Sequence, residues 1–120
     1  MEKSDRSWLF LALAAIGLSL LMLVPLACGG AAQSVGLSCR DHADCPGEAR
    51  CLRGDRYPGG TCTIACDGHF DCPGFAYCID REGGVCLEGC DRDRDCRSSY
   101  ECDDQRNYGS GGRSNVCIGD

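Results

Sequence analysis

The chain has 120 residues, 13 cysteines and a formal net charge of −6 at pH 7. Beyond the first 27 residues, acidic side chains outnumber basic ones by 16 to 10. This excess of acid argues against nucleic-acid binding and against docking on anionic lipid by charge.

The N-terminus has the organisation of an export signal. A short polar segment is followed by an almost unbroken apolar run from Leu9 to Leu26 and then by small residues. We therefore expect residues 1–27 to be a signal peptide, and the protein to be exported to an oxidising compartment. Because the run is just long enough to span a bilayer, an uncut membrane helix is an alternative.

Cys28 is the odd cysteine and directly follows the apolar run. The stretch from Val24 to Gly29, VPLACG, resembles the lipobox of bacterial lipoproteins, with Ala27 at the small position and Pro25 departing from the aliphatic one. The resemblance implies that the signal is removed, that the Cys28 sulfur carries a diacylglyceryl group, and that the protein is anchored in the bacterial cell envelope. The alternative to this anchor is ordinary cleavage after Ala32, which gives a secreted protein.

The other twelve cysteines form three copies of one pattern. In each copy the first three are spaced C-x5-C-x5-C, and the fourth follows after ten, seven or fourteen residues. We predict a flexible tether over residues 28–38 and cysteine modules over residues 39–65, 66–89 and 90–120. The expected disulfide cysteines are Cys39, Cys45, Cys51, Cys62, Cys66, Cys72, Cys78, Cys86, Cys90, Cys96, Cys102 and Cys117.

Too few large apolar residues follow Cys28 to offset the conformational entropy of some 80 ordered residues, so disulfides must contribute. The expected fold is therefore small and disulfide-rich, with three tandem four-cysteine modules, short β-hairpins, single helical turns and many loops. Within a module, Asp-Cys-Pro fits an aspartate N-cap with proline early in a helical turn.

The third and fourth cysteines are expected to lie on a β-hairpin. If its loop has four residues, Asp80 pairs with Val85 and Ile79 with Cys86, so that Cys78 and Cys86 face opposite sides. This register favours first-to-third and second-to-fourth pairing, although four cysteines allow three connectivities.

The recurring pattern C-x3-4-D-C-P-x4-C…G-x-C resembles two small extracellular modules, the Dickkopf N-terminal cysteine-rich region and the EB module. The resemblance extends from Cys39 to Ile118, and no copy has an adjacent Cys-Cys pair. It implies an exported interaction scaffold.

Three patterns bear on the alternatives of zinc binding, calcium binding and cell adhesion. The C-x5-C spacing lacks the C-x2-4-C knuckles of zinc sites, so disulfides are favoured over metal. Asp91, Asp93 and Asp95 are a weak calcium candidate, because the EF-hand places for glycine and glutamate hold cysteines. Arg53-Gly54-Asp55 resembles the integrin-binding motif of disintegrins, but one such tripeptide is readily expected by chance in a chain of this composition.

No catalytic site is indicated. We interpret the two histidines, His42 and His69, as exposed loop residues at unequal module positions, with no nucleophile, base and orienter in a suggestive arrangement.

The sequence thus predicts an envelope-anchored or secreted binding scaffold that is not an enzyme and holds no cofactor. Its expected partner is an unknown protein or glycan, with the membrane contacted through the anchor at Cys28, and its oligomeric state is not indicated. A disulfide-rich protease inhibitor and a purely structural envelope protein are the alternatives.

Overall fold

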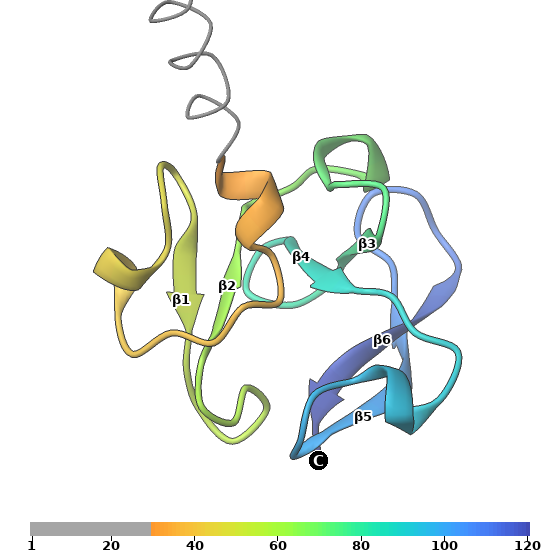
Figure 1. Cartoon of the computed structure of the whole chain (residues 1–120). Helices are drawn as coiled ribbons and strands as arrows, with labels where there is room; N and C mark the ends of the chain where they lie inside the picture. Colours follow the sequence, from red (N-terminus) through yellow and green to blue (C-terminus); the bar gives the residue numbers. More distant parts are fainter. Residues whose placement is uncertain (1–29) are drawn as a thin grey trace, which may run out of the picture.

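The computed structural model describes residues 30–120 and divides them into three small β-hairpins joined by short turns (Figure 1). The strands are β1 (Arg50–Leu52), β2 (Thr61–Thr63), β3 (Ala76–Ile79), β4 (Val85–Glu88), β5 (Tyr100–Arg106) and β6 (Arg113–Gly119). The 3-10 turns are η2 (Ala31–Ser34), η3 (His42–Asp44), η4 (His69–Asp71) and η5 (Asp93–Asp95). Each module contributes one two-stranded antiparallel sheet, which confirms the predicted fold class. Within residues 30–120 no helix has the length and apolar character needed to cross a bilayer.

All three modules have the same plan, a 3-10 turn followed by a hairpin. The turn ends at the aspartate before the second cysteine, so the prediction of an aspartate N-cap with the helical turn after it is wrong. Instead the carboxylate reaches back along the chain: Asp44 accepts a hydrogen bond from the backbone N–H of Arg40 at 2.8 Å. Asp71 and Asp95 do the same four residues back. The recurrent aspartate therefore closes the loop that begins at the first cysteine.

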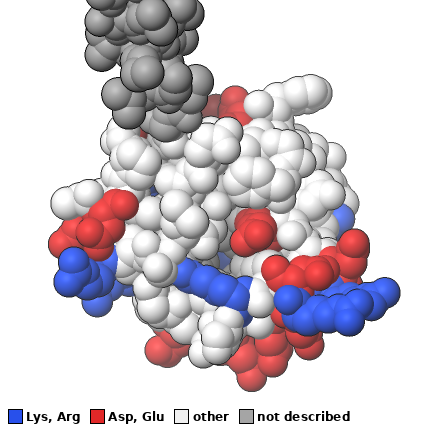
Figure 2. All heavy atoms as spheres, in the orientation of Figure 1, with Lys and Arg blue, Asp and Glu red and all other residues white. Residues whose placement is uncertain are grey.

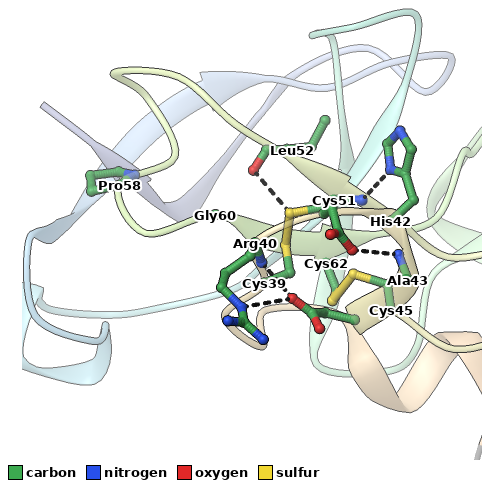
Figure 3. The surroundings of a disulfide bond; sticks show 12 residues. Cys39, Arg40, His42, Ala43, Cys45, Cys51, Leu52, Pro58, Gly60 and Cys62 are labelled. Carbon is green, nitrogen blue, oxygen red and sulfur yellow. Dashed lines mark hydrogen bonds and ion pairs between the residues drawn. A yellow bond between two sulfur atoms is a disulfide. The ribbon is translucent and has the colours of Figure 1, made fainter.

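Each module pairs its first cysteine with its third and its second with its fourth. The pairs are Cys39–Cys51, Cys45–Cys62, Cys66–Cys78, Cys72–Cys86, Cys90–Cys102 and Cys96–Cys117. The preferred connectivity is thus the observed one, and all six bonds lie within modules. Figure 3 shows both bonds of the first module beside the turn that carries His42.

The register from which that connectivity was argued is nevertheless wrong. Cys78 lies directly opposite Cys86, and Ile79 opposite Val85. The loop therefore has five residues rather than four, with positive φ at Glu82, Gly83 and Gly84. Side chains of directly opposed residues share a face, so both cysteines point to the same side, where the N-terminal half of the module supplies a partner for each.

The flexible tether expected for residues 28–38 is wrong over its described part. Ala31–Ser34 forms η2, and Val35 behind it is only 4% exposed, within the core of the first module. The backbone also pairs with β2, because Cys62 donates its N–H to the carbonyl of Leu37 at 2.8 Å. In the second module Cys86 donates to Ile64 in the same way, again two residues before a first cysteine. The segment before Cys39 thus pairs with module one in the way that the segment before Cys66 pairs with module two.

The modules are joined by repeated backbone contacts. Ala65, in the first three-residue linker, bridges to Val85, and Gly89, in the second, bridges to Val116. In both cases the linker adds to the last strand of the following module. This pairing fixes the orientation of each module relative to the one before it.

Two apolar clusters form the core. The first contains cysteines and alanines of modules one and two, with Val35 and Ile64. The second draws on all three modules: Leu52, Tyr57, Ile79, Val85, Leu87, Val116 and Ile118. Module three also returns to module one, since Gly119 donates its N–H to the carbonyl of Arg56 at 2.7 Å. The modules therefore form one closed unit, in which module three contacts module one as well as module two.

Candidate binding surface

The second module carries exposed aromatic side chains that its sister modules lack. Phe70, Phe75 and Tyr77 are 104%, 44% and 42% exposed. Counted from the first cysteine, the position of Phe75 holds Glu48 in module one and Ser99 in module three. The same counting places Arg50 and Glu101 at the position of Tyr77, and Ala43 and Arg94 at that of Phe70. Since the modules adopt the same plan with polar or small residues there, the fold does not require the aromatic rings.

Phe75 and Tyr77 line an open hollow at the junction of modules two and three. The hollow has a volume of about 360 Å³ and is bordered by Gly74, Phe75, Tyr77, Glu88, Gly89, Cys90, Asp91 and Asp95. One wall is a short aromatic surface from β3, and the other is the start of module three. The Tyr77 ring lies directly over Gly89, where a Cβ would come within 2.7 Å of the ring, so any side chain at that position would displace it.

The polar wall of the hollow is acidic. The pKa of Glu88 is raised from its usual value because the side chain is partly desolvated, an effect that Arg97 partly offsets. The pKa of Asp95 is lowered, because its carboxylate accepts hydrogen bonds from the backbone N–H groups of Asp91 and Arg92. Aromatic faces next to carboxylates attract cations, through the ring quadrupole and through charge. The hollow is thus suited to a cationic group.

A second cavity, close to where the modules meet, is too small for a ligand. It holds about 10 Å³, the space of one water molecule, and is lined by Gly36, Thr61, Leu87, Glu88, Arg97, Tyr100 and Cys117. The Arg97 guanidinium fills the region beside it, 4.4 Å from the centroid of the Tyr100 ring, and donates to the Tyr100 hydroxyl and to the carbonyl of Gly60. Arg97 therefore ties module three to module one.

Arg53-Gly54-Asp55 is exposed but lies in a loop held by module three. The backbone of Asp55 packs on Gly119, where a Cβ would approach its carbonyl oxygen to 2.7 Å. The tripeptide is thus accessible on a braced loop.

The calcium candidate is not assembled as a ligand cluster. Asp93 accepts a hydrogen bond from the backbone N–H of Cys102, and Asp95 accepts from two backbone groups. In the part of the chain that the structure describes, the only groups of three metal-ligating side chains are cysteines, one group in each module. Their sulfurs are joined in disulfides, so these groups are structural.

The two histidines occupy equivalent positions, contrary to the expectation. Each lies three residues after a first cysteine, and its Nδ1 accepts a hydrogen bond from the backbone N–H of the third cysteine, at 3.0 Å for His42 and 2.9 Å for His69. Asp93 has this role in module three. The interpretation as loop residues is replaced by a structural one: a side-chain acceptor at this position holds the start of the hairpin (Figure 3).

Some of the predicted features lie outside the described residues. These are the signal peptide, Cys28 and the cleavage site next to it. The aromatic residues of module two were missed in the sequence, although alignment of the three copies shows that only the second has rings at these positions.

The chain was compared with protein-family models, with curated proteins and with solved structures, and none of the three comparisons gives a match.

Proposed function

We propose that this protein is an exported, envelope-anchored binding scaffold without catalytic activity, and that its ligand binds in the hollow between modules two and three. The observation that carries the proposal is the pair of exposed rings, Phe75 and Tyr77, at positions where the sister modules fold without aromatic residues. Binding sites characteristically combine aromatic surface with a few polar groups in a concave place. The six disulfides are of the kind typical of exported proteins and supply a rigid frame for such a site.

The charge of the hollow favours one class of ligand. Glu88, Asp91 and Asp95 border it, so a protein partner that presents a lysine or arginine side chain fits better than an acidic one. The sequence predicts a protein or a glycan as the partner, and a glycan that stacks on the rings of Phe75 and Tyr77 is the second candidate.

The test is titration of the ¹⁵N-labelled protein with short arginine- and lysine-containing peptides and with neutral oligosaccharides, followed by NMR. Shifts centred on Phe75, Tyr77 and Asp91 would support the site. Phe75→Ala should abolish them, whereas the matched variant Glu48→Ala in module one should leave them unchanged. Shifts that survive Phe75→Ala, or that centre on another surface, would contradict the proposal.

We also propose that Cys28 carries the anchor, and the structure of the following residues supports this. Cleavage after Ala32 would remove Ala31 and Ala32, which pack against the first core. It would also remove the carbonyl of Ala31 that accepts the Ser34 hydroxyl hydrogen bond at 2.6 Å. Cleavage before Cys28 keeps all of η2. The resemblance to a lipobox agrees with that position.

The anchor is tested by fractionation. The wild type should partition into detergent and incorporate labelled fatty acid, and Cys28→Ser should remain unprocessed or leave the membrane fraction. A wild-type protein with Gln33 at its N-terminus would refute lipidation.

Inhibition of a protease by the purified protein, at a loop rather than at the hollow, would instead favour the alternative function of a protease inhibitor.

A further inference from the structure

We propose that the end of the molecule that carries Phe70 rests on the bilayer, with the Phe70 ring inserted in the interfacial region. The inference rests on the proposed anchor at Cys28 and goes beyond it, because it orients the whole domain relative to the membrane.

The first step is the shortness of the connection. Gly30 lies only two positions after Cys28, a distance of at most about 7 Å of extended chain. The folded unit starts at once, since η2 begins at Ala31, and Val35 is buried. An anchored protein therefore has no tether that would let the domain move away from the lipid surface, and its N-terminal end must face the bilayer.

The second step is the position of Phe70. It is the middle residue of η4, and in Figure 1 η4 lies at the same end of the molecule as η2 and the start of the described chain. The turn η5 of module three lies at the opposite end. On the face drawn in Figure 2, most charged side chains gather in a band across the lower half, and some acidic atoms also show at the upper end.

The third step is that the fold does not need this ring. The side chain is fully exposed, and the equivalent positions hold Ala43 in η3 and Arg94 in η5, where the turn forms in the same way. A fully exposed phenylalanine is unfavourable in water, and aromatic residues are enriched where a protein meets the headgroup region.

The neighbouring charges select the lipid. Asp67 and Asp71 flank the turn, and the Asp71 carboxylate accepts the backbone N–H of Asp67 at 2.8 Å. Anionic headgroups would be repelled, so the expected surface is zwitterionic.

The experiment uses tryptophan fluorescence, because Trp8, the only tryptophan of the chain, lies in the signal and is absent from protein processed at Cys28. The processed, lipidated protein, which begins at Cys28 and carries Phe70→Trp, is reconstituted in phosphatidylcholine vesicles that contain lipids brominated in the acyl chain. We expect the emission at position 70 to shift to shorter wavelength and to be quenched by the brominated lipid. Arg94→Trp, the matched position at the far end, should show neither effect and measures any intrinsic preference of tryptophan for the interface.

The outcomes separate the two proposals. Anchored protein whose fluorescence at position 70 is unquenched, or quenched no more than that at position 94, overturns the membrane contact and leaves the anchor standing. Protein that does not associate with the vesicles at all overturns both.

Discussion

Replacement of Ile118 by alanine tests whether the three modules unfold as one. Ile118 is 1% exposed and comes from the last strand of module three. It belongs to the cluster that also contains Leu52 and Tyr57 of module one and Ile79 and Leu87 of module two. If this cluster joins the modules, a substitution in it must lower the stability of all three.

The expected loss can be worked out from the side chain. Ile118→Ala removes three buried carbons, worth about 2.4 kcal/mol at about 0.8 kcal/mol each, and the cavity left behind adds to this. The total should lie at about 3 kcal/mol, because isoleucine-to-alanine changes in cores cost about 2–5 kcal/mol. The free energy of opening should fall by this amount, which accelerates hydrogen exchange through the opened state by about 100-fold.

The assay is native-state hydrogen exchange of the oxidised protein, read by mass spectrometry for each hairpin. Faster exchange is expected in β1–β2 and β3–β4 as well as in β5–β6. The companion variant is Ile64→Ala, whose side chain lies in the first cluster, built mainly from modules one and two. If the three modules unfold as one, it should also accelerate exchange in β5–β6. Exchange that increases only in β5–β6 after Ile118→Ala would show that the modules are independent and would refute the closed unit.

Three further predictions concern the removal of module three, the histidine acceptor in module two and the aspartate before the second cysteine of module three. Truncation after residue 89 should leave the native disulfides in modules one and two but expose an apolar face. The exposed face should be detectable as dye binding and self-association. A truncated protein that stays monomeric with wild-type stability would contradict the shared cluster. His69→Asp should be tolerated, because Asp93 is the backbone acceptor at the same place in module three, whereas His69→Ala should lose about 1 kcal/mol in urea unfolding; equal losses would refute the acceptor role. Asp95→Asn should destabilise at pH 7, because the folded-state pKa lies below the usual 3.8, so the ionised carboxylate stabilises the fold above that pH. The difference from wild type should vanish as the pH falls through the lowered pKa, and a difference that persists in strong acid would exclude the charge as its cause.

Most of the local architecture is predictable from the spacing of cysteines, glycines and aspartates. Repeated C-x5-C-x5-C spacing indicates the modules, and Gly83-Gly84 before Cys86 indicates a hairpin. The register was misjudged because Glu82 also adopts positive φ, at 51°, which lengthens the loop by one residue and which sequence patterns rarely reveal. The role of Asp44 is local as well, but the direction in which its carboxylate reaches is visible only in the structure.

The long-range features were not predictable. Val35 and the exposed Leu37 are the only large apolar residues in a stretch rich in glycine and alanine, so nothing in the sequence distinguishes a docked segment from a tether. The second cluster assembles residues more than 60 positions apart, such as Leu52 and Ile118, and depends on how the modules turn relative to one another. The candidate hollow depends on that same geometry, and only its aromatic residues stand out when the copies are compared.

The backbone pairing of linker and following module explains which spacings can change during evolution. Both linkers have three residues, and each is an added strand segment, through Ala65 and Gly89. A one-residue insertion in a linker would reverse the side-chain alternation and shift the next module's first cysteine out of reach of its partner. The hairpins differ in length, and the spacing before the fourth cysteine varies from seven to fourteen residues. Their tips nevertheless contact other modules, through Arg56 and Gly119 and through Tyr108 and Cys78. Changes of length are therefore accommodated in the hairpins, provided that these contacts between modules are kept, while the linkers between the modules must keep their length.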